Sequence, residues 1–173
     1  RRLYDLYAEA HTPFDWFPAL FDHAREIGIT CFASVFDRSS VDMLEQLDCP
    51  AYKIASMEIV DTPLIRQAAS TNKPLIISTG MASMREIMDA DAAVGMTHAA
   101  AFLHCTSEYP ATPARAGLCG IGKLASMLPN REIGISDHTV GPIVPIAATA
   151  LGGAIIEKHI RMNGDQSAED ASF

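Results

Sequence analysis

The sequence has few aromatic residues and no long hydrophobic run that is free of helix breakers. Aromatic residues make up 7% of the 173 residues, and there is one Trp. The longest uncharged stretch, residues 140–156, holds two prolines and several glycines, which makes it a poor membrane span. We therefore expect no membrane partner, and a buried helix followed by a strand explains this stretch better.

Positive charge is also scarce, and the common nucleotide-binding and hydrolase motifs are missing. Thirteen Lys and Arg residues face 21 Asp and Glu residues, for a formal net charge of −8. This balance argues against nucleic acid as a partner, and it means that an anionic substrate would need specific binding residues. No P-loop, GxGxxG, HExxH or nucleophile elbow occurs.

The four cysteines are scattered, without the CxxC spacing of a metal or redox site. Cys31 and Cys105 lie inside expected strands. Reduced thiols in the cytoplasm fit this usage best. No signal peptide is visible, and the chain begins with Arg1 rather than Met, so we expect the natural N-terminus to lie further upstream.

One pattern occurs four times: an apolar run ends in a polar group, in residues 51–56, 74–80, 102–107 and 133–138. Parallel strands that are covered on both faces are apolar, and α/β proteins bind ligands at the carboxyl ends of such strands. The pattern therefore predicts Lys, Ser, Thr and His side chains around one shared pocket.

Apolar periodicity predicts six strands separated by helices. The expected strands are residues 29–36, 52–55, 75–78, 100–105, 132–136 and 154–159, and the expected helices are residues 13–28, 41–47, 62–70, 83–93, 118–128 and 144–151. Consecutive βα units indicate an α/β protein, either a (β/α) barrel or a doubly wound sheet. A TIM barrel has eight strands, so six units would form a partial one.

His138 and His159 end successive expected strands. Neighbouring parallel strands lie roughly 4.8 Å apart, so one divalent metal could bridge the two imidazoles. Neutral imidazole suits Mn, Fe, Co or Zn, and two ligands leave open positions for substrate and water. The alternative is that both are rim histidines that form hydrogen bonds with loops.

Lys53 lies in an expected strand among apolar neighbours, where an unpaired ammonium is costly. A phosphate or carboxylate would pair with it; the alternatives are a Schiff-base lysine or a buried salt bridge with Glu58. The Ser78-Thr79-Gly80 turn and Ser136 can present hydroxyls to phosphate oxygens, or can simply cap turns.

Other candidates are weaker on spacing alone. Glu58 and Asp170 could bind sugar hydroxyls and Tyr109 could form a wall, although spacing alone favours solvated surface roles for all three. Lys158 should point to the opposite face from His159 and form an ion pair. The methionines at positions 81, 84 and 88 have the spacing of a core stripe.

Taken together, five segments resemble the sialic acid synthase family. They are YKIAS at 52–56, STGMA at 78–82, HCTS with YP at 104–110, ISDHT at 135–139 and EKH at 157–159. Residues 4–7, 10–13 and 54–61 are more similar to the pseudaminic acid synthase branch. The resemblance covers essentially the whole chain.

The resemblance implies a TIM barrel followed by an antifreeze-like domain, in an enzyme that works as a homodimer. It implies condensation of phosphoenolpyruvate with an N-acetylated amino sugar, with a divalent metal such as Mn, Mg or Co. In the pseudaminic acid branch the sugar is of the 2,4-diacetamido-2,4,6-trideoxy-altrose type; the rival branch, N-acetylneuraminate synthase, uses N-acetylmannosamine.

Site roles follow from the same resemblance. Phosphoenolpyruvate would contact Ser34, Lys53, Ser78 and Ser136, the metal would lie on His138 and His159, and the sugar would face Glu58, Ser107, Tyr109 and Asp170. Lys53 and the two histidines would be the catalytic residues.

The chain also departs from the family pattern. The first two barrel strands, which bear a glutamate and a second lysine, and the antifreeze-like domain have no counterpart here. We therefore expect residues 1–173 to form one partial barrel domain that is inactive alone. The tail around Asp170 has two letters exchanged relative to the family. A Schiff-base aldolase on Lys53 and a non-catalytic barrel fragment are the alternatives from other classes.

Overall fold

Six strands alternate with helices in a computed structural model that describes residues 4–5, 8 and 11–161. The strands are β1 (Ala33–Ser34), β2 (Tyr52–Ile54), β3 (Leu75–Ser78), β4 (Ala100–Cys105), β5 (Glu132–Asp137) and β6 (Ile155–Lys158). The helices are α2 (Phe17–Ile27), α3 (Arg38–Glu45), α4 (Thr62–Ser70), α5 (Met84–Val94), α6 (Cys119–Met127) and α7 (Ile143–Ala150), with short 3-10 turns η1 (Phe14–Trp16), η2 (Glu58–Val60) and η3 (Pro113–Arg115). None of the helices in these ranges is long and apolar enough to cross a membrane.

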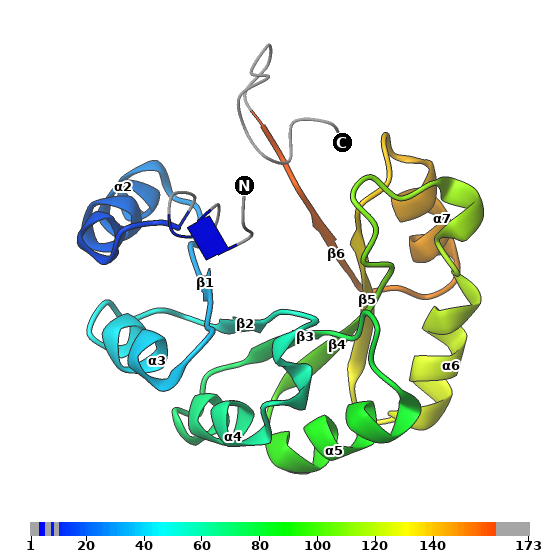
Figure 1. The fold of residues 1–173 in the computed structure, drawn as a ribbon, viewed down its shortest axis with the longest axis horizontal. Coiled ribbons are helices and arrows are strands. Elements are labelled where there is room, and N and C mark those ends of the chain that lie inside the picture. The colour runs from blue at the N-terminus through cyan, green and yellow to red at the C-terminus, as the bar shows by residue number, and fades with distance from the viewer. Residues whose placement is uncertain (1–3, 6–7, 9–10, 162–173) are drawn as a thin grey trace.

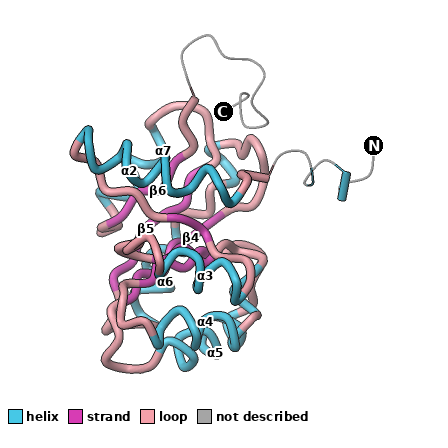
Figure 2. The backbone as a smooth tube through the Cα atoms, turned by 90° about the vertical axis from the view of Figure 1, so that its left-hand side faces the viewer, coloured by secondary structure: helices cyan, strands magenta, loops and turns pink. Residues whose placement is uncertain are grey.

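All six strands are parallel and follow one another in the order β1 to β6. Figure 1 shows the sheet as a curved fan with the helices along its outer side, and Figure 2 shows it from the side. A doubly wound sheet reverses its strand order at a switch point, and this sheet does not. The expected partial TIM barrel is therefore confirmed, as a half-barrel of six parallel strands.

Local sequence explains where the helices begin and end. The Ser83 side chain accepts a hydrogen bond from the Glu86 amide while Glu86 reaches back to the Ser83 amide, a capping box that starts α5. Asp61 accepts from the Leu64 amide at the start of α4. Gly28 ends α2 with a φ of 76°, a conformation that glycine adopts without strain. The expected helix boundaries are therefore confirmed to within a few residues.

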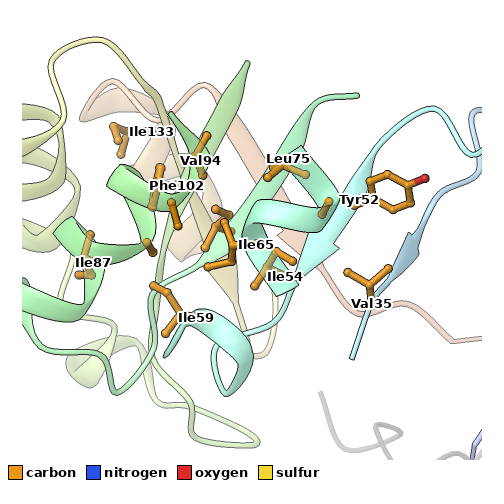
Figure 3. Packing of buried hydrophobic residues seen from close by; sticks show 14 of the residues in the cluster. Val35, Tyr52, Ile54, Ile59, Ile65, Leu75, Ile87, Val94, Phe102 and Ile133 are labelled. Atoms are coloured by element: carbon orange, nitrogen blue, oxygen red, sulfur yellow. The ribbon is translucent and has the colours of Figure 1, made fainter. Parts of the chain in front are cut away.

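The core lies between the outer face of the sheet and the helices. Tyr52, Ile54, Leu75 and Phe102 project from three neighbouring strands and pack with Ile65 of α4 (Figure 3). Successive side chains of a strand point to opposite faces. Residues between these apolar positions must therefore face the inner, concave side of the half-barrel.

Two expectations about apolar residues are wrong. The apolar run at 29–36 forms only the short strand β1, so Cys31 is not in a strand. The proposed methionine core stripe is exposed: Met81, Met84 and Met88 are 70%, 53% and 46% exposed. The buried side of α5 consists instead of Ile87, Ala90, Ala93 and Val94. Spacing of three and four indicates one helix face but does not say which face is covered.

The isolated 173-residue chain is expected to aggregate or to form concentration-dependent oligomers. Within the described residues, β1 and β6 are the edges of the sheet and each has a partner strand on one side only. Unpaired strand edges are templates for further pairing. Light scattering over a concentration series measures this; a sharp monomer peak with cooperative melting would contradict it.

Candidate active site

A cavity of about 620 Å³ opens at the carboxyl ends of the strands. Every strand contributes at least one polar residue to its lining: Ser34 from β1, Lys53 from β2, Ser78 from β3, Cys105 from β4, Ser136 from β5, and Glu157 and Lys158 from β6. Ser107, Tyr109, His138 and His159 line it from the segments that follow β4, β5 and β6. The shared pocket expected from the repeated pattern therefore exists.

Lys53 is the central cation of this cavity. It is 6% exposed, and its Nζ donates to Ser78 Oγ at 2.8 Å and to the Ile54 carbonyl at 3.0 Å. Burial lowers the pKa of Lys53, although the nearby Glu157 carboxylate opposes that shift. The salt bridge with Glu58 considered from the sequence is not formed. The carboxylate partner is Glu157, whose Oε2 lies 3.5 Å from Nζ.

Glu157 links the groups around Lys53 and was missed by the sequence reasoning. Its Oε1 accepts from Ser136 Oγ at 2.6 Å and from Ser78 Oγ at 3.4 Å. One carboxylate therefore organises a lysine and two hydroxyls from three other strands. The sequence does indicate that Glu157 faces the cavity, because it lies two residues before His159 and residues two apart in a strand share a face.

The two histidines expected at the strand ends lie side by side. The ring centroids of His138 and His159 are 5.1 Å apart, and the Tyr109 ring lies 4.1 Å from His138 and 5.9 Å from His159. His138 Nδ1 lies 3.0 Å from the Thr106 carbonyl oxygen, which can only accept. Nδ1 therefore carries the proton, and in neutral His138 the lone pair lies on Nε2.

This donor set fits a divalent metal held by two imidazoles. A backbone carbonyl that fixes the tautomer is the usual support of a histidine ligand. Among the described residues, no group of three or more His, Cys, Asp or Glu side chains is arranged to hold a metal. Two imidazoles by themselves would leave positions on a metal for water and substrate oxygens.

Cys105 adds a thiol to the cavity that the sequence reasoning did not assign. Its Sγ lies 3.9 Å from His138 Nδ1 and 3.7 Å from Ser107 Oγ. Burial raises the pKa of Cys105, but hydrogen bonds from His138, Ser56 and Ser107 outweigh it and lower that pKa. For His138, burial opposes protonation, while its bonds to Cys105 and Thr106 prevail and raise its pKa.

Comparison with known proteins places this chain in a family. The sequence profile of the NeuB family matches residues 1–173. The chain belongs to the NeuB family. The resemblance to sialic acid synthases expected from the sequence is thus confirmed.

The relatives of this NeuB family chain include a pseudaminic acid synthase, an N,N'-diacetyllegionaminic acid synthase and N-acetylneuraminate-9-phosphate synthases. It is 41% identical over 173 residues to a pseudaminic acid synthase from Helicobacter pylori, covering 99% of this chain and 51% of that protein. The chain spans about half the length of the curated relatives that it matches.

Solved structures support the same placement. The spore coat polysaccharide biosynthesis protein spsE from Bacillus subtilis superimposes with a TM-score of 0.88 and 34% identity, covering 100% of this chain and 49% of that one. An N-acetylneuraminic acid synthetase from Leptospira borgpetersenii, in complex with citrate, gives a TM-score of 0.84 at 34% identity, covering 90% of this chain and 54% of the other. The half-barrel is therefore the same fold as the corresponding part of these proteins.

Among the described residues, one expected site residue of the NeuB family chain does not line the cavity. Glu58 begins η2 and is not among the lining residues; its Oε2 is buried and has no hydrogen-bond partner among the described residues. Burial raises the pKa of Glu58. Asp170 lies outside the described residues. All other site residues expected from the sequence line the cavity.

Replacing Gly80 by Ala is expected to disturb the site more than the fold of this NeuB family chain. A Cβ at Gly80 would lie 2.2 Å from Ser107 Oγ and 2.8 Å from Ser56 Oγ, both short hydroxyls that can rotate away. We expect a loss of about 1 kcal/mol in stability and a roughly 10- to 100-fold loss in catalytic efficiency. Thermal melting and steady-state kinetics of the intact protein measure both. Gly122→Ala, where nothing lies within 4 Å, is the matched control; equal effects of the two changes would contradict the prediction.

Proposed function

We propose that the protein containing this chain condenses phosphoenolpyruvate with a 2,4-diacetamido-2,4,6-trideoxy-altrose type sugar, giving pseudaminic acid and phosphate. The observation that carries the proposal is the cavity itself. It holds a buried lysine with serine hydroxyls on one side and two adjacent imidazoles on the other. These are the groups that an anionic donor and an aldehyde acceptor require.

Phosphoenolpyruvate carries a phosphate and a carboxylate, so its site needs a cation and hydroxyl donors. Lys53 and Ser78 are already hydrogen-bonded to each other, and Ser136 reaches the same carboxylate of Glu157. Because burial weakens competition from water, an ammonium at this position binds an anion more strongly than an exposed lysine does. We assign Lys53, Ser78 and Ser136, with Ser34 at the edge of the cavity, to the donor.

We assign a divalent metal, Mn, Mg or Co, to His138 and His159. When bound, such a metal supplies Lewis acidity toward the aldehyde oxygen of the open-chain sugar. The protein's own contribution is to present the two imidazoles together, with His138 held in one tautomer by the Thr106 carbonyl. Lys53 and the serines hold the donor at bonding distance from the acceptor, which removes most of the entropic cost of a two-substrate reaction.

The reaction balances with these groups. C3 of phosphoenolpyruvate forms a bond to the aldehyde carbon, and the aldehyde oxygen takes up a proton. Water adds at C2 and loses a proton. The C2–O bond to phosphate then breaks as the C2 hydroxyl becomes a carbonyl, and the departing phosphate takes up the hydroxyl proton. Lys53 stays in contact with the phosphate throughout and stabilises its charge as it departs.

The sugar side is assigned to Ser107 and Tyr109, which line the cavity beside the histidines. The Tyr109 ring packs on His138 and offers a flat wall. Glu58 and Asp170 complete the proposed sugar contacts. The Glu58 assignment follows from the family resemblance, because Glu58 does not line this cavity and its Oε2 is buried.

We further propose that the intact protein works as a homodimer in the cytoplasm. All four cysteines are free thiols, which suits a reducing compartment.

Sugar specificity is tested by assaying the intact protein with phosphoenolpyruvate, Mn²⁺ and each sugar, and by measuring phosphate release. We expect turnover of the diacetamido trideoxy sugar. Consumption of N-acetylmannosamine alone would instead favour an N-acetylneuraminate synthase, and phosphate release with neither sugar would remove the proposal.

One observation favours a second chemistry: burial lowers the pKa of Lys53, which is what an amine that forms a Schiff base needs. Borohydride distinguishes the two. We expect no reduced adduct on Lys53 and loss of activity with a chelator; a trapped adduct together with activity that survives the chelator would establish the aldolase instead.

A further inference from the structure

The residues directly before the two histidines pair with each other. Asp137 and Lys158 are opposite one another in the register of β5 and β6, and each is followed by a proposed metal ligand, His138 or His159. Lys158 Nζ donates to Asp137 Oδ2 at 2.7 Å, as expected from the sequence for an ion-pair residue.

The same ammonium reaches the other side of His138. Lys158 Nζ also donates to the Thr139 carbonyl, at 2.5 Å. Lys158 therefore binds both residues next to His138 in the chain, Asp137 and Thr139. Lys158 itself directly precedes His159.

Asp137 is fully engaged in this arrangement. Its side chain is 1% exposed. Its Oδ1 accepts from the Thr139 amide at 3.1 Å and from Thr139 Oγ1 at 2.8 Å. Hydrogen bonds between Asp137 and Thr139 thus hold the turn at residues 137–139. The Ala111 amide, from the loop after β4, also donates to the His138 carbonyl at 2.9 Å. The backbone at His138 has little freedom to move unless these bonds break.

Stability alone does not explain this ion pair, in which the Asp137 side chain is 1% exposed and the Lys158 side chain 28% exposed. Desolvating the two charges offsets much of their attraction, so such a pair adds little to folding compared with apolar residues. The ion pair does fix the position of one strand end relative to the other. These are the two strand ends whose imidazole rings lie 5.1 Å apart.

We propose that Lys158 is a positioning residue that, through Asp137 and the Thr139 carbonyl, sets the separation and orientation of the His138 and His159 imidazoles for metal binding. This inference rests on the proposed function, because it assumes that the histidines hold a divalent metal. Lys158 acts on the backbone of the ligands and is not itself a ligand.

The test measures Mn²⁺ binding to the intact protein by titration calorimetry and by the EPR signal of free Mn²⁺, without substrate. Lys158→Met keeps the apolar stem and removes the ammonium. Loss of a group that orients metal ligands typically weakens metal affinity about 10- to 100-fold, and we expect a change in that range. Lys158→Arg, which keeps a cation with several donors, should restore most of the affinity.

The matched control is Lys73→Met. Lys73 Nζ also pairs with a carboxylate, Glu45 Oε1 at 2.6 Å, but it lies before β3 and does not line the cavity. Its removal should leave Mn²⁺ affinity unchanged. If Lys158→Met destabilises the fold by leaving Asp137 unpaired, the double variant Asp137→Asn, Lys158→Met removes that charge, and its Mn²⁺ affinity should still be low when its melting temperature has recovered.

Two failures are distinguishable. If His138→Ala binds Mn²⁺ as tightly as the unchanged protein, the proposed metal site itself is wrong. If His138→Ala loses Mn²⁺ but Lys158→Met and the double variant bind it normally, the metal site stands and the positioning role of Lys158 is overturned.

Discussion

Lys53→Met is expected to weaken phosphoenolpyruvate binding by about 3 kcal/mol, or roughly 100-fold, since removing one partner of a buried, hydrogen-bonded charge pair costs on the order of 2–5 kcal/mol. Lys53 is the cation that Ser78 and Glu157 surround. Without it, the Glu157 carboxylate is left in the donor site and repels the incoming anion, which adds to the loss. Calorimetric titration of the intact protein with phosphoenolpyruvate measures the effect.

Lys123→Met is the control for this change, because Lys123 is an exposed residue of α6 that does not line the cavity. It should leave donor binding unaltered. Comparable binding by the two variants would show that the donor does not lie against Lys53.

The pH dependence of donor binding has a definite sign. Burial lowers the pKa of Lys53, although Glu157 opposes this, and only the protonated amine attracts the phosphate. Affinity should therefore be high below that lowered pKa and should fall as the pH rises through it. The Lys53→Met variant should lack this alkaline decrease, which ties the titration to this residue.

His138→Ala is expected to abolish Mn²⁺ binding and to reduce turnover roughly 1,000-fold. A bound metal contributes several kcal/mol of charge stabilisation in the transition state, and each 1.36 kcal/mol is a factor of ten in rate. His138 is buried, its tautomer is fixed by Thr106, and its ring lies beside that of His159. Metal titration and initial rates over a Mn²⁺ series measure the two effects.

His23→Ala serves as the control, since His23 is exposed on α2 and pairs only weakly, at 3.6 Å, with Glu26. It should bind Mn²⁺ and turn over substrate normally. A His138→Ala protein that retains full activity after dialysis against a chelator would rule out a catalytic metal at this position.

The order of elements was predictable because helices and strands have different apolar periods. The expected strands at 75–78 and 100–105 and the helix at 62–70 coincide with β3, β4 and α4. The strand expected at 29–36 was predicted too long, because only Ala33 and Ser34 form β1. An apolar run does not by itself show that a segment is buried or paired: Ile29, Phe32 and Phe36 are 59%, 40% and 61% exposed. Strand length depends on the partner, and β1 pairs with β2 only at Ala33 and Ser34.

Within the site, strand alternation and position predicted most of the lining. Lys53 lies between the core residues Tyr52 and Ile54, so it had to face the other side of the sheet. The partner of Lys53 was not predictable in this way. Glu58 is close in sequence, but Glu157, more than a hundred residues away, forms the ion pair because β6 brings it to the same concave face.

The sequence by itself determined the class of fold, the family and the set of polar groups at the strand ends, because each of these follows from local periodicity and from short segments in a given order. Only the tertiary structure decided which of those groups meet. The contact of Glu157 with Lys53, the bonds of Lys158 to both sides of His138, and the exposure of Met84 and Met88 on α5 all depend on how distant segments pack. Curvature and register arise from contacts between segments far apart in the chain, so they cannot be predicted from any short stretch of sequence.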